Sequence, residues 1–382
     1  MVRRACLAVV ALLAVLATPV QASRGDVTRT AAEPRVAAAA WYLVGNDGVL
    51  LAAHRARERR AVASITKLMT AVVTLEHASP SDVVTVRERA PVAGESTVYL
   101  RAGETLTVAD LLRATLVPSA NDAAHALALH VGEGSVPRFV ALMNRKAREL
   151  GLTDTMFRNP HGLDTAGHVS SARDATLLVR HALGVPFLRD ALGRTSVSLP
   201  GGRDFPTTDD LLEAWPPLLG GKTGHTMDAG WSQAAAASAK GITVYGSVLG
   251  SETRGERNDA LRALLQHGLD RYRRVTAIDA SRVYAQAPTG YGRPDVELVV
   301  RRSLLRTVRD DQALVERVVA PTALALPVRE GQALGRVEIW HRSRLLASSD
   351  LVAASSISEP GIVGKAWWYA RTTAENFWGL VT

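Results

Sequence analysis

The chain has 382 residues, of which 47% are apolar, and carries a formal net charge of +8 at neutral pH. These values are typical of a globular chain of two or three units that can bury a core. The single cysteine, Cys6, excludes an internal disulfide, and its place in a leader-like segment leaves no thiol for catalysis or metal binding in a mature protein. The positive charge comes from scattered arginines, which favour anionic neighbours, but no nucleic-acid-binding module is visible.

The N-terminal segment has the order of a secretory signal peptide. Residues 1–22 have Arg3 and Arg4 near their start, then a short apolar run, and end at the small-residue site "VQA". An uncleaved membrane helix fits less well, because Pro19 interrupts the short run. We therefore expect export to the outer face of the cytoplasmic membrane, in the periplasm or cell wall. The polar, aperiodic residues 23–35 predict a linker.

The next part, residues 36–275, predicts an α/β domain with a largely antiparallel sheet between helical layers. Two apolar runs around Asn46-Asp47-Gly48 are typical of a β-hairpin. Apolar side chains at three-and-four spacing indicate helices, and two later strand-like runs are broken at a Lys-Gly pair. The expected elements are a hairpin around 46–48, helices over 65–75, 108–115 and 134–151, strands on both sides of 240–241, and a helix over 258–272.

The C-terminal part predicts two further pieces. Residues 276–358 contain short strand-like runs such as "VELVV" and "LGRVEIW" between glycine turns, which favour a small all-β domain. Residues 360–382 place aromatic and apolar side chains on one helical stripe, interrupted by charges that prevent an unaided bilayer crossing. We expect an amphipathic helix that anchors the protein at a membrane surface. The alternative is a terminal helix packed on the protein's own core.

The stretch "ASITKLMTA" carries the first chemical signal. Ser64 and Lys67 lie three residues apart, and Lys67 is one of only five lysines among 45 basic residues. A lysine amine can lose its proton, whereas arginine stays protonated. A neutral lysine could therefore activate the serine as a nucleophile. Taken alone, a Ser-x-x-Lys pattern more often marks a solvated helix face.

Two further stretches strengthen this interpretation. "PSAND" contains Ser119 and Asn121, and "GGKTGHT" contains Lys222 and Thr223 at the start of a strand-like run. In order and separation they match the motifs of penicillin-recognising acyl-transfer enzymes. The chain resembles the serine-type D-alanyl-D-alanine carboxypeptidases, which are low-molecular-mass penicillin-binding proteins. The resemblance covers about residues 36–355 and includes "FRNPHGLD" and "HVSSARDA".

This resemblance implies removal of the terminal D-alanine from peptidoglycan stem pentapeptides through a Ser64 acyl-enzyme, without a cofactor or metal. Lys67 would be the general base, and Ser119 would relay a proton to the departing D-alanine. The backbone N–H groups of Ser64 and His225 would form the oxyanion hole. β-Lactams would acylate the same serine. The implied substrate-binding residues are Asn121, Lys222, Thr223, Gly224, His225 and Arg257.

Several other residues have open interpretations. The resemblance places Arg257 near the carboxylate site, while its position on a predicted helix favours a solvated arginine. Asp209 stands where the family tends to have asparagine, which puts hydrogen bonding near the cleft in question. Four histidines lack the usual spacing of metal ligands and are interpreted as surface or packing residues. They are His125, His130, His161 and His168.

Three other functions compete with a carboxypeptidase. A D,D-endopeptidase that cuts peptide cross-links would use the same chemistry and differ only in its leaving group. A class A β-lactamase needs a second acid, usually in a Glu-x-x-Leu-Asn stretch, which is absent from the chain. A non-catalytic wall-binding protein would have a degenerate site, and the intact motif residues argue against that.

Overall fold

The computed structural model describes residues 13–19, 34–87 and 96–378. The charged start of the predicted signal peptide, its cleavage site and most of the predicted linker lie outside the described residues. The chain divides into two compact units, one formed by residues 30–272 and the other by residues 1–29 with 273–382. The division falls close to the predicted boundary between residues 275 and 276.

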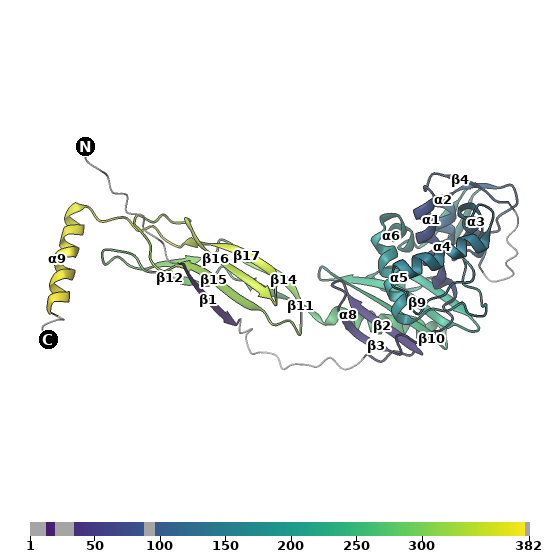
Figure 1. Ribbon diagram of the computed structural model, residues 1–382, viewed down its shortest axis with the longest axis horizontal. Coiled ribbons are helices and arrows are strands. Elements are labelled where there is room, and N and C mark those ends of the chain that lie inside the picture. The colour runs from purple at the N-terminus through teal and green to yellow at the C-terminus, as the bar shows by residue number, and fades with distance from the viewer. Residues whose placement is uncertain (1–12, 20–33, 88–95, 379–382) are drawn as a thin grey trace. The chain divides into compact units, whose positions relative to one another are not determined.

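The unit of residues 30–272 is built around a five-stranded antiparallel sheet with the strand order β3-β2-β10-β9-β8 (Figure 1). Strands β2 (Ala40–Gly45) and β3 (Leu50–His54) form the predicted hairpin. Strands β8 (Leu218–Thr226), β9 (Gly230–Ala239) and β10 (Ile242–Ser251) follow one another as an antiparallel meander. The predicted combination of helices with an antiparallel sheet is confirmed.

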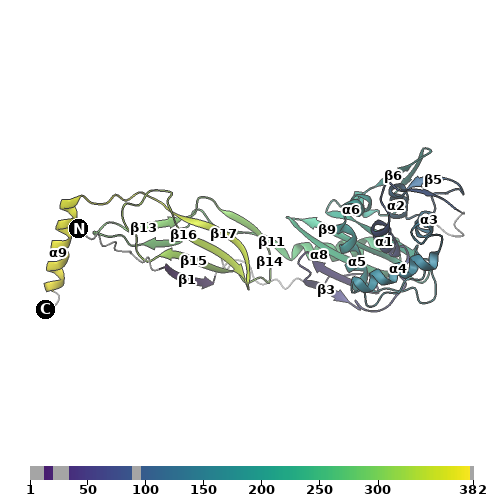
Figure 2. The same cartoon turned by 45° about the horizontal axis from the view of Figure 1, so that its top comes forward.

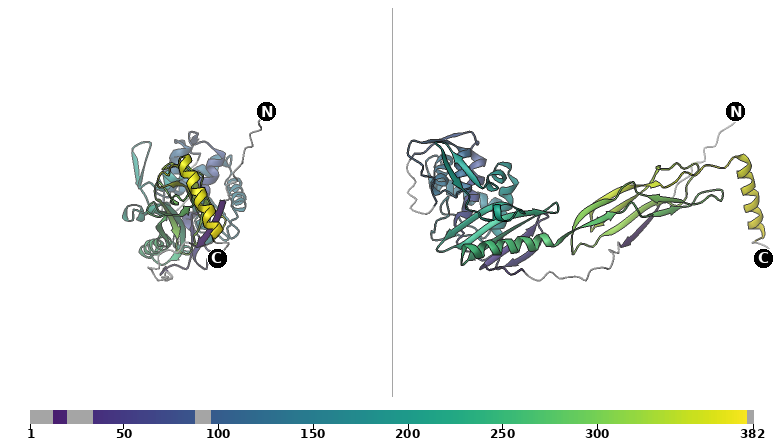
Figure 3. Two further views of the ribbon diagram at one scale, coloured as in Figure 1. Left: turned by 90° about the vertical axis from the view of Figure 1, so that its left-hand side faces the viewer. Right: turned by 180° about the vertical axis from the view of Figure 1, so that it is seen from behind.

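Helices cover both faces of this sheet (Figure 3). Helix α8 (Arg254–Asp270) packs on one face, and α5 (Ala172–Gly184) packs on the other. Successive alanines of β9 alternate between the faces, so that Ala234 belongs to the core shared with α5 and Ala235 to the core shared with α8. Their small side chains let helices approach the strand closely from both sides.

The remaining helices and short strands of this unit are not part of the five-stranded sheet. Helix α8 begins four residues earlier than predicted, because Thr253 and Glu256 form a capping box before the apolar stretch. The remaining elements are a 3-10 turn (Ala63–Thr66), α1 (Lys67–His77), α2 (Val108–Leu116), α3 (Asn121–Val131), α4 (Val136–Glu149), α6 (Pro186–Leu192), α7 (Leu211–Ala214), and the short strands β4 (Val83–Thr85), β5 (Thr105–Thr107), β6 (Ser196–Leu199) and β7 (Arg203–Pro206).

The other unit contains a six-stranded sheet with the order β1-β15-β16-β17-β13-β12 and a two-stranded sheet of β11 and β14 (Figure 2). Its core includes Val296, Leu298, Val337, Ile339 and Leu351. The strands after residue 271 are β11 (Tyr272–Ile278), β12 (Ala285–Ala287), β13 (Val296–Val299), β14 (Leu304–Arg309), β15 (Val315–Pro321), β16 (Ala333–His341) and β17 (Arg344–Ala353).

Strand β1 (Leu13–Pro19) lies inside the predicted signal peptide and pairs antiparallel with β15. The first strand of the sheet is therefore a segment that export would remove. Its loss would leave β15 as an edge strand of the sheet, because β1 is the neighbour of β15 on that side. The signal-peptide interpretation stays a prediction.

The last helix, α9 (Ile362–Trp378), exposes most of its large apolar side chains. The exposed fractions of Ile362, Val363 and Trp367 are 89%, 83% and 73%, so the alternative of a terminal helix packed on the core is wrong for these residues. Trp368 contacts Tyr291 edge-on with the ring centroids 5.5 Å apart. Within the described residues, no helix has the length and apolar character needed to cross a membrane.

Candidate active site

Ser64 lies in a strained turn directly before α1. The turn is a 3-10 helix over Ala63–Thr66, and α1 begins only at Lys67, so the pair does not sit within one α-helix as predicted. Side chains at i and i+3 of a 3-10 turn eclipse each other, which keeps both groups on one side. Ala63 has a left-handed φ of 46°, and Gly162 packs so closely that a Cβ there would be 1.8 Å from the Ala63 carbonyl oxygen.

The Lys67 amine connects the predicted catalytic residues. Its Nζ lies 2.7 Å from Ser64 Oγ, 3.4 Å from Ser119 Oγ and 2.6 Å from Asn121 Oδ1. The Lys67 side chain is completely buried. An ammonium group would donate to all three oxygens, whereas a neutral amine has two N–H donors and one lone pair. The neutral form can therefore donate to Ser119 and Asn121 while accepting the proton of Ser64.

Electrostatics favour this neutral form. Burial is the main cause that lowers the pKa of Lys67 well below its usual value, and the positive charge of Lys222 is the second. The carboxylate of Asp122 opposes both effects by raising the pKa of Lys67. A lysine with a strongly lowered pKa can act as a base near neutral pH.

Ser119 and Asn121 reach Lys67 from the start of α3. Ser119 has a left-handed φ of 66°, and Asn121 is the first residue of the helix. The Asn121 backbone N–H donates to the Ser96 carbonyl, and the neighbouring Asp122 carboxylate accepts the backbone N–H of Leu100. These bonds fix the beginning of α3 against the adjacent loop. Ser119 and Asn121 are 4% and 5% exposed, so they line the inner part of the site.

Strand β8 forms the opposite wall. Lys222 and Thr223 lie in the middle of the nine-residue strand, so the prediction that they lie at a strand start is wrong. Both residues are buried, and Thr223 Oγ1 lies 2.7 Å from Thr208 Oγ1. A Cβ at Gly224 would be 2.9 Å from the Val62 carbonyl oxygen and 3.1 Å from Ser64 N. A glycine here lets the backbone of β8 run against the turn that carries Ser64.

The prediction of a solvated Arg257 is wrong, because the residue is 1% exposed. Its guanidinium donates to Asn258 Oδ1 with Nε 3.1 Å away and lies 3.5 Å from Asp210 Oδ2. The guanidinium carbon also lies 5.8 Å from the centre of the Trp231 ring. Because the capping box starts α8 at Arg254, Arg257 lies in the first turn of the helix, and its side chain lies against Trp231 of β9 and not in solvent.

His225 and Trp231 form a stacked pair next to this arginine. They are register partners on β8 and β9, and their ring centroids are 4.0 Å apart with an interplanar angle of 26°. No sequence motif pointed to a role for Trp231. Its signal was present, because counting outward from the turn between the two strands places Trp231 opposite His225.

Asp209 and Gln233 form a buried, hydrogen-bonded pair that no sequence pattern predicted. Asp209 is 3% exposed, accepts from Gln233 Nε2 at 2.7 Å and accepts from the Leu211 backbone N–H at 3.1 Å. The question about hydrogen bonding at this position is thereby answered, because both oxygens of the carboxylate have a donor. Gln233 is the register partner of Thr223, so the pair lies directly behind the β8 motif.

Two of the histidines, His161 and His168, have pKa values that burial lowers. His168 Nδ1 accepts from the Arg158 backbone N–H at 3.1 Å, so its Nε2–H donates to Thr66 Oγ1 at 2.7 Å. Burial lowers the pKa of His168 to about 4 and that of His161 to about 3, which makes both rings neutral at physiological pH. Among the described residues there is no group of three potential metal ligands.

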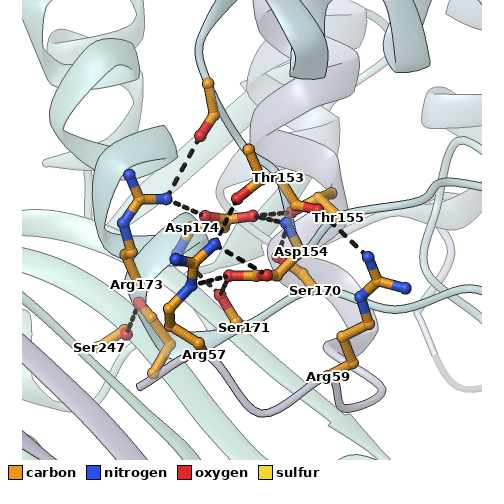
Figure 4. Close-up of polar contacts among 12 residues, drawn as sticks. Arg57, Arg59, Thr153, Asp154, Thr155, Ser170, Ser171, Arg173, Asp174 and Ser247 are labelled. Carbon is orange, nitrogen blue, oxygen red and sulfur yellow. Dashed lines mark hydrogen bonds and ion pairs between the residues drawn. The ribbon is translucent and has the colours of Figure 1, made fainter.

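A polar network holds the segment that leads into the Ser64 turn (Figure 4). Arg57 Nε donates to Asp154 Oδ2 at 3.1 Å, and Arg173 Nη1 donates to the buried Asp174 at 2.8 Å. The Asp154 backbone N–H in turn donates to Asp174 Oδ2 at 2.7 Å. These bonds tie Arg57, which precedes the Ser64 turn in the chain, to the loop that contains Asp154.

Comparison with known proteins identifies the family. The family model described as D-alanyl-D-alanine carboxypeptidase matches residues 27–253, which is more than half of the chain. The chain belongs to this family. The matched range contains the predicted motif residues from Ser64 to His225 and ends four residues before Arg257.

Individual carboxypeptidases are similar to this chain over most of its length. The D-alanyl-D-alanine carboxypeptidase DacD of Salmonella typhimurium is 31% identical over 87% of this chain and 89% of its own length. Penicillin-binding protein 5 from Haemophilus influenzae has a similar structure, with 28% identity, a TM-score of 0.61, and coverage of 85% of this chain and 99% of its own. A DD-transpeptidase from Streptomyces K15 covers 62% of this chain with a TM-score of 0.60.

Proposed function

We propose that this D-alanyl-D-alanine carboxypeptidase removes the terminal D-alanine of peptidoglycan stem pentapeptides through an acyl-enzyme on Ser64. The observation that carries the proposal is the buried Lys67 amine, 2.7 Å from Ser64 Oγ. A serine hydroxyl becomes a nucleophile when an adjacent base removes its proton.

In acylation, Ser64 Oγ attacks the carbonyl carbon of the bond between the last two D-alanines, and its proton passes to Lys67 Nζ. Collapse of the tetrahedral intermediate breaks the C–N bond, and the departing amine takes a proton that Ser119 relays from Lys67. The 3.4 Å separation of Lys67 Nζ and Ser119 Oγ suits such a relay. The products are free D-alanine and an ester on Ser64.

In deacylation, a water molecule attacks the ester carbonyl while Lys67 accepts one of its protons. The C–O bond to Ser64 then breaks, and Lys67 returns the proton to Ser64 Oγ. The shortened stem peptide leaves and the enzyme is restored. A β-lactam would acylate the same Ser64 oxygen, with its ring C–N bond opening in place of the peptide bond, which makes penicillin a probe of the nucleophile.

Substrate recognition follows from the two walls of the site. The backbone N–H groups of Ser64 and His225 would bind the developing oxyanion, a contribution of roughly 3 kcal/mol for each donor. Lys222 and Thr223 would bind the terminal carboxylate, and the depth of Lys222 keeps water from screening its charge. Asn121 would orient the substrate amide. Buried Arg257 adds positive charge behind the same wall.

We further propose that the protein acts outside the cytoplasm, after cleavage of residues 1–22, with α9 lying on the membrane surface. Exposed Ile362, Val363 and Trp367 support this arrangement, because such side chains partition into the headgroup boundary. Deleting residues 360–382 should abolish co-sedimentation with anionic phospholipid vesicles and leave penicillin acylation unchanged. Continued sedimentation of the truncated protein would refute the role of α9.

The substrate is tested by mass spectrometry of the products from purified pentapeptide muropeptides and, separately, from cross-linked dimers. We expect the pentapeptides to lose one alanine and the dimers to remain intact. Cleaved dimers would instead establish the endopeptidase alternative. Labelling with fluorescent penicillin tests the nucleophile independently, and retention of the label by Ser64→Ala would exclude the assigned serine.

A further inference from the structure

The loop of residues 159–168 lies against the turn that carries Ser64. A Cβ at Gly162 would be 1.8 Å from the carbonyl oxygen of Ala63, so the loop touches the residue directly before Ser64. Two side-chain bonds hold the loop to the same turn and to α1. Thr70 Oγ1 donates to the Pro160 carbonyl at 2.5 Å, and the His168 Nε2–H donates to Thr66 Oγ1 at 2.7 Å. The loop is therefore fixed to the Ser64 side of the site.

Asn159 fixes the shape of this loop. Its Oδ1 accepts the backbone N–H of Gly162 at 2.7 Å, and its Nδ2 donates to the Leu163 carbonyl at 2.9 Å. Gly162 has a left-handed φ of 93°, which glycine adopts without a steric penalty. The bend at Gly162 is thus held by side-chain bonds on both sides, and it sets the position of Asp164 two residues later.

Asp164 connects the loop to the end of β8. Its Oδ1 accepts from Thr226 Oγ1 at 2.7 Å, and its Oδ2 accepts from the backbone N–H of Asp228 at 3.3 Å. Thr226 is the last residue of β8, and its Oγ1 also accepts the backbone N–H of Ala229 at 3.2 Å. Both oxygens of the Asp164 carboxylate therefore hold the turn between β8 and β9.

The two attachment points of the loop flank the proposed oxyanion hole. On one side the loop contacts the residue directly before Ser64, and on the other it binds the residue directly after His225. Only Leu163 separates Gly162 from Asp164. A spacer of three residues thus joins the two backbone segments whose N–H groups would bind the oxyanion.

We propose that Asp164 is a positioning residue that sets the separation of the two oxyanion-hole donors, acting through Thr226 and without contact to the substrate. The inference rests on the proposed function, in which the N–H groups of Ser64 and His225 bind the oxyanion. Such donors stabilise the transition state when they lie about 3 Å from the developing charge. A displaced end of β8 would lengthen a bond that is needed in the tetrahedral intermediate more than in the bound substrate. Loss of the carboxylate should therefore slow acylation without weakening binding.

Three variants separate the parts of this contact. Asp164→Ala removes both acceptors, while Asp164→Asn keeps an oxygen that can accept the Thr226 hydroxyl. Thr226→Val removes the hydroxyl and keeps the branched shape of the side chain. Because the Asp164 carboxylate is exposed, its removal should cost the fold little. Asp190→Ala is the matched control, since it removes an exposed carboxylate that pairs with Arg194 on α6.

The test is stopped-flow acylation of the full chain over a range of penicillin concentrations, which gives the acylation rate constant and the dissociation constant of the non-covalent complex. Asp164→Ala and Thr226→Val should each acylate about tenfold more slowly, with the dissociation constant unchanged within about twofold. The double variant should be no slower than either single variant, because both remove the same contact. Asp164→Asn should stay within about threefold of the wild type, and Asp190→Ala should match it.

Three results would overturn the inference. They are a wild-type rate constant in Asp164→Ala, an equal loss in Asp190→Ala, and an Asp164→Asn variant as slow as Asp164→Ala. The rate constant is a property of the folded fraction, so partial unfolding lowers the amplitude and leaves the test intact. If Asp164→Ala does not fold at all, Thr226→Val has the same expected loss.

A boronic acid inhibitor gives a second readout, because it forms a tetrahedral adduct on Ser64 with an oxygen in the oxyanion hole. Its inhibition constant should rise about tenfold in Asp164→Ala, while the melting temperature falls by only a few degrees. A lower melting temperature with an unchanged inhibition constant would show a merely structural role and refute the inference. Neither readout uses pentapeptide, so the proposed function fails separately, by absence of D-alanine release from pentapeptide by the wild type.

Discussion

The variant Lys67→Arg keeps a positive charge at this position but removes the base. Arginine stays protonated at any pH that a folded protein meets, so it supplies no base at pH 7. Loss of a positioned general base costs about 10²–10⁴ in rate. Lys67 is completely buried, so the larger guanidinium should also destabilise the fold by about 1–3 kcal/mol. A domain stable by about 5–15 kcal/mol remains folded after such a loss.

The assay is the rate of acyl-enzyme formation with a penicillin, followed by intact-protein mass spectrometry, together with a thermal melt. We expect acylation to be at least about 10²-fold slower, while the melting temperature falls by only a few degrees. Lys146→Arg is the matched control, since Lys146 forms an ion pair with Glu76 at 2.8 Å, away from Ser64, and should acylate normally. Acylation by Lys67→Arg within tenfold of the wild type would refute the general-base role.

Three further predictions follow from the site. Because burial lowers the pKa of Lys222 to about 7 and its ammonium form is proposed to bind the carboxylate, kcat/KM for a pentapeptide should fall about tenfold per unit above that pH; a flat profile to pH 9 would contradict this. Gly162→Ala, with φ +93° and a backbone oxygen 1.8 Å from the new Cβ, should melt far below Gly151→Ala, which has φ +67° and nothing within 4 Å. Folding holds His168 neutral with a pKa of about 4 instead of 6.5, so its stabilisation, about 3 kcal/mol, is present above pH 6.5 and is lost as the pH falls toward 4. Urea unfolding as a function of pH should show a loss of stability on acidification that is smaller by about 3 kcal/mol in His168→Gln than in the wild type, because His161, whose pKa burial lowers to about 3, contributes a loss in both proteins.

The motif chemistry could be predicted from the sequence because it depends on short spacings. Ser64 and Lys67 are three residues apart, and three residues of either helical type place them together. The hairpin around Asn46 could likewise be predicted, since its turn residues and flanking apolar runs are local signals. The start of α8 was predicted too late, because the apolar period begins inside the helix and the polar capping box precedes it.

The sequence alone predicts the reacting set: a serine, an amine that can lose its proton, a second hydroxyl, and a Lys-Thr pair on a strand. The protonation states and contacts of these groups depend on the tertiary structure, because burial and pairing between distant residues leave no pattern in a short stretch of sequence. The tertiary structure buried Arg257 against Trp231, which the helical spacing could not indicate. It also buried Asp209 against Gln233, where desolvation raises the pKa of the carboxyl group.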